Sequence, residues 1–127
     1  MENKCTKIAL VVGTRPNFMK AIPVWEQLQK QMMAYMKHKQ VKENLFIIHT
    51  GQHYSKKLSD IFLEQLGVPK KDIVTLKGYP KTVTPDKAFS WMLTSLTSWF
   101  RKNKIQKVVV FGDVNSSLAG ALSASFL

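Results

Sequence analysis

Residues 8–20 read IALVVGTRPNFMK, and this stretch decides the fold. A run of apolar residues stops at Gly13, and a helical pattern opens at Pro16. Short apolar runs bounded by glycine are typical of buried strands in parallel sheets. Proline suits the first turn of a helix, where its missing N–H costs nothing. The stretch therefore predicts a strand, a sharp turn at a glycine that has no Cβ, and a helix.

The turn between this strand and this helix is a candidate anion site. Backbone N–H groups at a helix start point beyond the strand and favour negative charge. Arg15 and Lys20 add two full positive charges near that point. We predict that Gly13, Arg15 and Lys20 bind a phosphate or a polyanionic sugar. The alternative is that Arg15 and Lys20 are solvated surface charges.

Composition limits the class of protein. The 127 residues suit one domain, residues 1–127, and a 45% hydrophobic content excludes a disordered chain. No apolar stretch approaches the about 18 residues of a membrane span, so we expect no membrane partner. The first residues lack the apolar core of a signal peptide. Because Cys5 has no second cysteine to pair with, we expect a cytoplasmic protein.

The formal net charge is +11, and only Arg15 and Arg101 among the basic residues are arginine. The lysines are scattered along the chain, a pattern typical of solvated loops and helix ends. A nucleic-acid surface is the alternative, since clustered charge suffices for binding that ignores sequence. No interleaving of aromatic and basic residues accompanies the charge, so we expect it to assist anionic ligands and do not expect nucleic acid as the partner.

Helical and extended patterns alternate along the rest of the chain. Pro23 falls inside the first helical pattern and is expected to bend it. Thr84-Pro85 reads as an N-cap followed by a proline in the first turn. The predicted strands are residues 8–12, 45–48, 73–76 and 108–111; the predicted helices are residues 17–36, 58–66, 85–100 and 115–127; residues 37–44 and 78–83 are expected to be loops.

This alternation predicts an α/β fold with a doubly wound, Rossmann-like parallel sheet. In the strand order 3-2-1-4, the first and fourth strands are neighbours, and ligands bind beyond their carboxyl ends. Gly13 and Gly112-Asp113 follow those two strands and should face one crevice. Asp113 is a candidate general acid or base, or a carboxylate that binds hydroxyl groups. The alternative is that Asp113 caps the last helix.

His49 and His53 flank the end of the second strand. They lie four residues apart but straddle a strand end and a loop, and no third ligand is nearby, so we predict no metal. We expect His49 to be buried and hydrogen-bonded, and His53 to lie near the crevice. GTRPNF lacks the later glycines of a dinucleotide fingerprint, so NAD is not expected, and we predict no cofactor.

The chain ends at Phe126-Leu127 within an apolar helical pattern. The fourth strand would then be an exposed edge of a parallel sheet, which proteins normally cover. We expect that the chain is a piece of a longer polypeptide. The alternative is that a partner subunit covers the edge.

Three segments together resemble the non-hydrolysing UDP-N-acetylglucosamine 2-epimerases. They are GTRPNFMK at 13–20, TGQHY at 50–54 and VVVFGDVNSSLAGALSASF at 108–126. The resemblance implies the first part of an architecture of two Rossmann-like domains similar to glycosyltransferase B, without the C-terminal domain that binds UDP. It implies interconversion of UDP-N-acetylglucosamine and UDP-N-acetylmannosamine without NAD or an obligatory metal, and a homodimer as the full-length protein.

The resemblance also assigns residues. Arg15, Lys20 and Asp113 match active-site positions, where the cations would stabilise the leaving diphosphate and Asp113 would act as acid, base or orienting group. Asn17 stands where the family usually has Glu. Gln52 matches a residue of a regulatory UDP-N-acetylglucosamine site, and His53 beside it is a second regulatory candidate, although Ser55 replaces a usual Gln. Segments like HVEAGLR and PEE would follow Leu127 and are absent here, so we expect this chain alone to be inactive. The alternative is a non-catalytic module that binds UDP-sugars or other anions.

Overall fold

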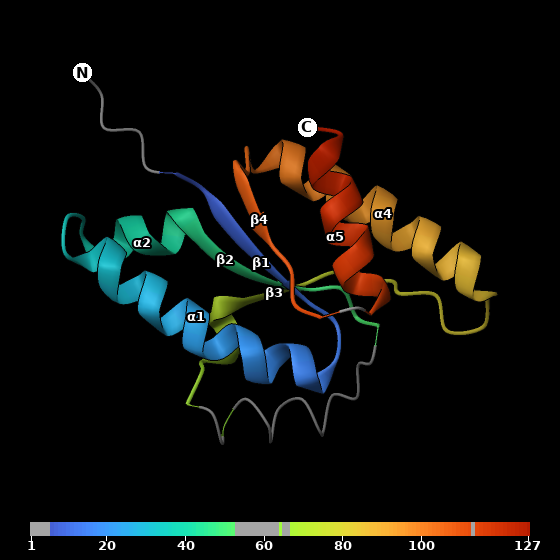
Figure 1. Ribbon diagram of the computed structural model, residues 1–127, viewed down its shortest axis with the longest axis horizontal. Coiled ribbons are helices and arrows are strands. Elements are labelled where there is room, and N and C mark those ends of the chain that lie inside the picture. The colour runs from blue at the N-terminus through green and yellow to red at the C-terminus, as the bar shows by residue number, and fades with distance from the viewer. Residues whose placement is uncertain (1–5, 53–63, 65–66, 113) are drawn as a thin grey trace.

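The fold is a parallel sheet of four strands in the order β3-β2-β1-β4, as predicted (Figure 1). The structure is a computed structural model that describes residues 6–52, 64, 67–112 and 114–127. The central strand β1 (Ile8–Val12) pairs over its whole length with β2 (Leu45–His49). On its other side β1 pairs with β4 (Lys107–Val109), and β3 (Ile73–Thr75) pairs with β2.

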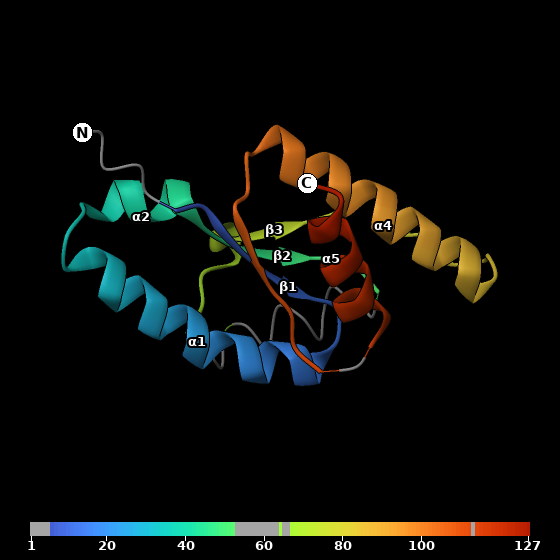
Figure 2. The same ribbon diagram turned by 45° about the horizontal axis from the view of Figure 1, so that its top comes forward.

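Helices cover both faces of the sheet. α1 (Arg15–Met33) and α2 (His38–Asn44) lie on one face, and α4 (Pro85–Lys102) and α5 (Asn115–Ser125) lie on the other (Figure 2). Alternate residues of β1 enter the two cores, because successive side chains of a strand point to opposite faces. Leu10 packs with the α1 side and Val11 with the α4 side. The uninterrupted apolar run of β1 follows from this double coverage.

The prediction of a loop at residues 37–44 is wrong, because α2 occupies this segment. The Gln40 side chain accepts a hydrogen bond from the Lys37 N–H, and Asn44 Nδ2 donates to the Gln40 carbonyl. Val41 is 1% exposed and packs in the core on the α1 side. One buried apolar residue in a single short helix leaves no periodicity to detect.

The ends of several other elements differ from the prediction. α1 runs through Pro23 and ends at Met33, and α5 ends at Ser125. β4 ends at Val109, and the carbonyl of Phe111, which the prediction placed in the strand, accepts side-chain hydrogen bonds. The helix predicted at residues 58–66 lies, apart from Glu64, outside the described residues. None of the described helices has both the length and the apolar character of a membrane span.

α4 begins as predicted, with Thr84 as its N-cap and Pro85 in its first turn. A hydrogen bond from the Thr84 side chain, assisted by backbone N–H groups, lowers the pKa of Asp86 below its ordinary value of 3.8. The substitution Thr84→Val removes the hydroxyl at constant shape and should raise this pKa, whereas Thr84→Ser should retain the shift. An NMR titration of the Asp86 carboxyl measures both.

The lowered pKa sets the sign of the pH dependence. A carboxyl whose folded-state pKa is depressed contributes stability above its unfolded-state pKa and loses it as the pH falls through the folded-state pKa. The contribution of Asp86 should therefore disappear only in acid, and it should be smaller in Thr84→Val than in the unchanged chain. An equal pKa in Thr84→Val and the unchanged chain would contradict the assignment to the hydroxyl.

Candidate functional site

Buried polar side chains gather at the carboxyl ends of β1, β2 and β4. Figure 2 shows that α1 and α5 both begin at this end of the sheet. Buried polar groups normally need hydrogen-bond partners, so such a gathering indicates a specific local arrangement. Of the buried polar residues that the structure describes, only Asn44 and Ser123 lie outside this group. We refer to the group as the polar cluster; it consists of Thr14, Asn17, His49, Thr50, Ser116 and Ser117.

Asn17 joins the end of β1 to the end of β4. Its Oδ1 accepts hydrogen bonds from the N–H groups of Gly13 (3.0 Å) and Thr14 (3.2 Å). Its Nδ2 donates to the carbonyl of Phe111 at 2.9 Å, and the residue is 2% exposed. The Phe111 carbonyl also accepts a hydrogen bond from the Ser117 hydroxyl, so α1 and α5 both hold it.

The segment after β2 is tied to the start of α5. The hydroxyl oxygens of Thr50 and Ser116 are 2.7 Å apart, and the Gln52 N–H donates to Thr50 Oγ1. Gln52 Oε1 accepts hydrogen bonds from the Ser116 hydroxyl and from the Ser116 N–H. The side chain of Gln52 thereby satisfies one of the N–H groups that the first turn of a helix leaves without an intrahelical partner. Its role as a regulatory residue stays a prediction.

Gly13 is required by close packing. A Cβ at this position would lie 1.9 Å from Ser116 Oγ and 2.6 Å from Ser116 Cβ. Gly112, in contrast, has a φ of +75°, which favours glycine, as expected for a turn. The expectation of a glycine at each strand end is therefore met for two different physical reasons.

The structure brings Lys20 to the end of β4. Its Nζ lies 3.7 Å from the point that a Cβ on Gly112 would occupy, and Asn17 Nδ2 lies 3.8 Å from the same point. Arg15 is the first residue of α1 and is exposed, as Lys20 is. The neighbouring ends of β1 and β4 thus bring Gly13, Lys20 and Gly112 together. Asp113 and His53 lie outside the described residues, so their places in the site stay predictions.

The turn offers an anion fewer backbone donors than we expected. Asn17 Oδ1 accepts from the N–H groups of Gly13 and Thr14, and Pro16 has no N–H. An anion at this helix start would therefore depend mainly on the charges of Arg15 and Lys20. Asn17, Thr50 and Ser116 were not among our candidate site residues, and only their position at strand ends and helix starts could have indicated them.

His49 is buried and hydrogen-bonded, as predicted. Its Nδ1 accepts a hydrogen bond of 2.6 Å from the Gly51 N–H, and its ring lies 5.1 Å from the ring of Phe18. Within the described part of the chain, no three His, Cys, Asp or Glu residues are grouped so that they could hold a metal ion.

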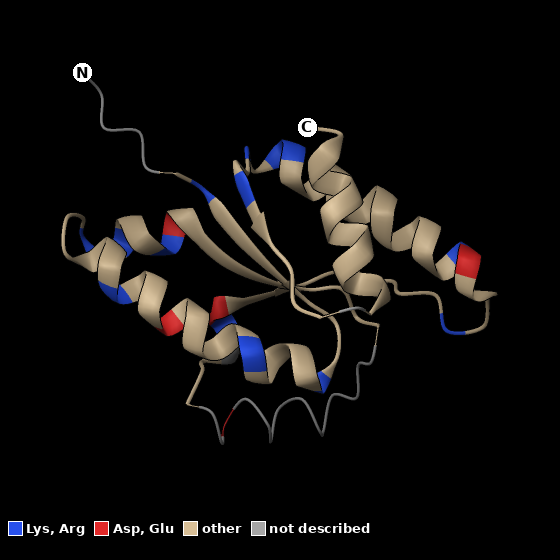
Figure 3. Ribbon diagram, viewed as in Figure 1, with Lys and Arg blue, Asp and Glu red and all other residues tan. Residues whose placement is uncertain are grey.

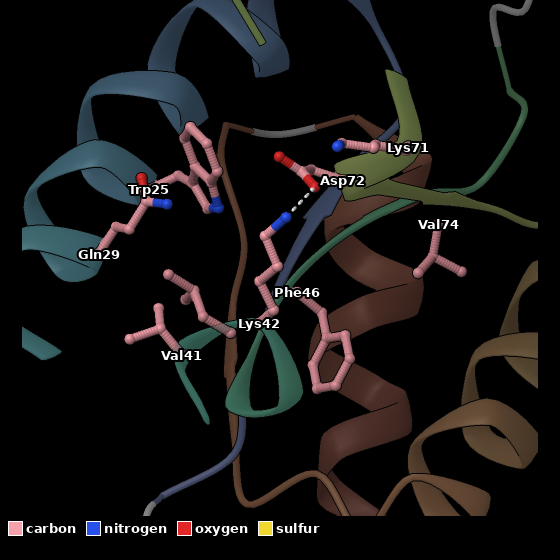
Figure 4. Close-up of a pocket in the computed structure, with 9 residues that line it drawn as sticks. Trp25, Gln29, Val41, Lys42, Phe46, Lys71, Asp72 and Val74 are labelled. Atoms are coloured by element: carbon pink, nitrogen blue, oxygen red, sulfur yellow. Dashed lines mark ion pairs between the residues drawn. The ribbon is translucent and has the colours of Figure 1, made fainter. Parts of the chain in front are cut away.

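A separate cavity of about 200 Å³ opens at the amino ends of β2 and β3 (Figure 4). It exists because β3 pairs with β2 only from Ile47 onward, which leaves Leu45 and Phe46 without a neighbouring strand on that side. The ammonium of Lys42 lies 3.6 Å from the carboxylate of Asp72 across it. None of the predicted site residues that the structure describes lines this cavity, which lies at the edge of the sheet opposite the polar cluster.

The basic residues that the structure describes are spread over the molecule. Figure 3 shows them on α1 and α2, at the starts of β1 and β4, and toward both ends of α4. This distribution matches the scatter of lysines in the sequence. Among the basic residues that the structure describes, Arg15 and Lys20 lie in the first turns of α1, beside the polar cluster.

A doubly wound parallel sheet with cations and a polar cluster at its switch point defines a Rossmann-like domain, a class of fold in which ligands bind at that point. The model of the UDP-N-acetylglucosamine 2-epimerase family matches residues 35–127. The chain belongs to this family. The match includes two of the three segments that carry the resemblance, residues 50–54 and 108–126.

Individual relatives agree with this assignment. Over 95% of its length the chain is 38% identical to a UDP-2,3-diacetamido-2,3-dideoxy-D-glucuronate 2-epimerase of Pseudomonas aeruginosa. It is 35% identical, again over 95% of its length, to a UDP-N-acetylglucosamine 2-epimerase of Methanocaldococcus jannaschii. The chain spans 31% and 30% of the lengths of these two relatives.

Solved structures show the same fold. The chain superposes on a UDP-N-acetylglucosamine 2-epimerase of Neisseria meningitidis, which was solved with UDP-N-acetylglucosamine bound, with a TM-score of 0.75. The sequence identity is 24%, and the match covers 95% of this chain and 29% of that one. The Rossmann-like architecture is therefore shared with structures of this family.

Proposed function

We propose that this chain is the front part of the N-terminal domain of a sugar-nucleotide isomerase. The isomerase interconverts UDP-N-acetylglucosamine and UDP-N-acetylmannosamine, and it acts as a homodimer of two-domain subunits. The observation that carries the proposal is the placement of Lys20 beside Gly112, at the switch point of a chain from this family. Ligands of doubly wound folds bind at that point.

The reaction requires cations for the leaving diphosphate and a group that transfers a proton. A base removes the proton at C2 of the sugar while the C1–O bond breaks, and UDP departs with the bonding electron pair. The product, 2-acetamidoglucal, then receives a proton at C2 on the other face, and UDP adds back to C1. Arg15 and Lys20 would stabilise the negative charge that develops on the leaving diphosphate. Asp113 would transfer or orient the proton.

The identity of the sugar has a second candidate. The relative with 38% identity is a UDP-2,3-diacetamido-2,3-dideoxy-D-glucuronate 2-epimerase, and the other relative, at 35%, is a UDP-N-acetylglucosamine 2-epimerase. The chemistry at C1 and C2 is the same for both, but the glucuronate carries an additional carboxylate. If the acidic sugar is the substrate, it should bind more tightly than UDP-N-acetylglucosamine, and the difference should shrink as salt is added.

UDP binding tests the proposed anion site. We expect saturable binding of UDP to the chain, and about tenfold weaker binding in Arg15→Ala and in Lys20→Ala, because a hydrogen bond to a charged group contributes about 1.5–3 kcal/mol. Lys42→Ala is the matched control. It removes the same charge at the opposite edge of the sheet and should leave the affinity unchanged. Titrations followed by NMR measure all four affinities, and an absence of binding at millimolar UDP would contradict the proposed anion site.

Turnover separates the isomerase fragment from its alternatives. The chain spans less than a third of its relatives, so we expect UDP binding without exchange of the C2 proton of UDP-N-acetylglucosamine in D2O. The same result fits a non-catalytic module that binds UDP-sugars. Joining the chain to the downstream part of a relative distinguishes the two, because only an isomerase domain would then restore epimerisation. Turnover by the chain alone would show that it is not an inactive fragment.

A further inference from the structure

We propose that Asn17 is the positioning residue of this site. Its uncharged amide holds the turn after β1 against the end of β4 and thereby places the Lys20 ammonium beside Gly112. The proposal rests on the proposed function only for its ligand, UDP. The structural connection made by Asn17 does not depend on that ligand.

Both ends of the Asn17 amide are used, and no part of it faces solvent freely. Oδ1 accepts from two successive N–H groups, those of Gly13 and Thr14, while Nδ2 donates to the Phe111 carbonyl. A side chain that is 2% exposed must find such partners, because an unpaired amide is costly to bury. One side chain therefore fixes the backbone on both sides of the switch point.

This connection acts where the backbone ladder stops. The register of β1 and β4 ends at Leu10 and Val109, so the segment that leads to Gly112 lies beyond the paired strands. Asn17 and Ser117 hold this segment through the Phe111 carbonyl, one from α1 and the other from α5. Without Asn17, the tie from the α1 side would be lost.

Asn17 also sets the place of the cation. Residues three apart on a helix lie on the same face, so Lys20 stands one turn after Asn17 on the side of α1 that faces β4. Asn17 Nδ2 and Lys20 Nζ accordingly lie at 3.8 Å and 3.7 Å from the same point above Gly112. If the start of α1 shifts relative to β4, the Lys20 ammonium shifts with it.

The connection requires a side chain that both accepts and donates hydrogen bonds. An aspartate at position 17 would still accept from the Gly13 and Thr14 N–H groups, but its carboxylate could not donate to the Phe111 carbonyl. It would instead place a negative charge against a carbonyl oxygen and beside an anionic ligand. Protonation of that carboxylate would restore a donor, so the defect should be reversible with pH.

The test compares two asparagine substitutions. Asn17→Asp should weaken UDP binding about tenfold at neutral pH. Asn44→Asp is the matched control, because Asn44 is also buried and its Nδ2 also donates to a backbone carbonyl, that of Gln40 in α2. It should lower stability but leave UDP affinity unchanged. If Asn44→Asp weakens UDP binding as much as Asn17→Asp, the proposal is wrong.

The pH profile separates positioning from general damage. UDP affinity is measured for the wild-type chain and for Asn17→Asp from neutral to acidic pH, and the carboxyl introduced at position 17 is titrated by NMR in the same range. The ratio of wild-type to Asn17→Asp affinity should fall as this carboxyl gains its proton, because the protonated group can again donate to Phe111. The ionisation of UDP itself cancels in the ratio. A ratio that stays constant through the titration would overturn the proposal.

Measurements without ligand keep this test independent of the proposed function. In the wild-type chain, one Nδ2 proton of Asn17 and the N–H protons of Gly13 and Thr14 should exchange slowly with solvent. In Asn17→Ala the two backbone protons should exchange at least about tenfold faster, whereas Asn44→Ala should leave them unchanged. If wild type does not bind UDP but these protons behave as expected, only the proposed function fails. Fast exchange in the wild type would refute the connection itself.

Discussion

Replacing Gly13 with alanine is expected to lower the free energy of unfolding by about 3 kcal/mol, because it overfills a tightly packed contact. The added Cβ would lie 1.9 Å from Ser116 Oγ and 2.9 Å from Thr50 Oγ1. Rotation of the serine side chain does not solve the conflict, since Ser116 Cβ would remain at 2.6 Å. The start of α5 must therefore move away from β1. Urea denaturation measures the loss.

Two further variants test this explanation. Gly67→Ala is the control, because Gly67 has a φ of +71° and no atom within 4 Å of an added Cβ, so it should cost only about 1 kcal/mol of backbone strain. In the background of Gly13→Ala, Ser116→Gly should recover stability better than Ser116→Ala, since only glycine removes the conflicting Cβ. Equal losses for Gly13→Ala and Gly67→Ala would contradict the steric argument.

The strand order and the coverage of both faces could be predicted because they depend on patterns that a sequence displays directly. The apolar run of β1 and the N-cap at Thr84 each carry a local signal. The short α2 carries none, since Val41 is its one buried apolar residue and side-chain hydrogen bonds at Gln40 supply the rest. Local pattern therefore predicted the fold but not α2.

The candidate site likewise has one part that the sequence indicates and another part that it does not. The placement of Gly13, Lys20 and Gly112 near the ends of β1 and β4 could be predicted, because the two glycines come after neighbouring strands and Lys20 lies in the first turns of the helix that follows β1. The polar cluster could not be predicted from the sequence. Thr50 and Ser116 are ordinary polar residues when considered separately, and their contact spans 66 positions. The role of Asn17 was equally hidden, since it depends on a carbonyl 94 positions away.

Gly120→Val should have a second large effect, because it acts on the same packing of α5 against the sheet. A Cβ at Gly120 would lie 2.9 Å from Val110 Cγ1 and 3.2 Å from Val11 Cγ2, and the two methyl groups of valine need additional space. We expect a loss of about 3 kcal/mol in the free energy of unfolding, measured by urea denaturation. Gly120→Ala should be nearly neutral, since alanine gains about 1 kcal/mol of helix propensity over glycine.

Ala121→Val is the matched control, because it introduces the same side chain one position later on the exposed face of α5. It should cost less than about 1 kcal/mol, the usual difference in helix propensity. Val110→Ala should restore part of the stability of Gly120→Val, because it removes the methyl group that the new side chain meets. Equal costs for Gly120→Val and Ala121→Val would contradict close packing. Displacement of α5 should also disturb the Ser117 bond to Phe111, so the NMR signal of Gly112 should shift in Gly120→Val and not in Ala121→Val.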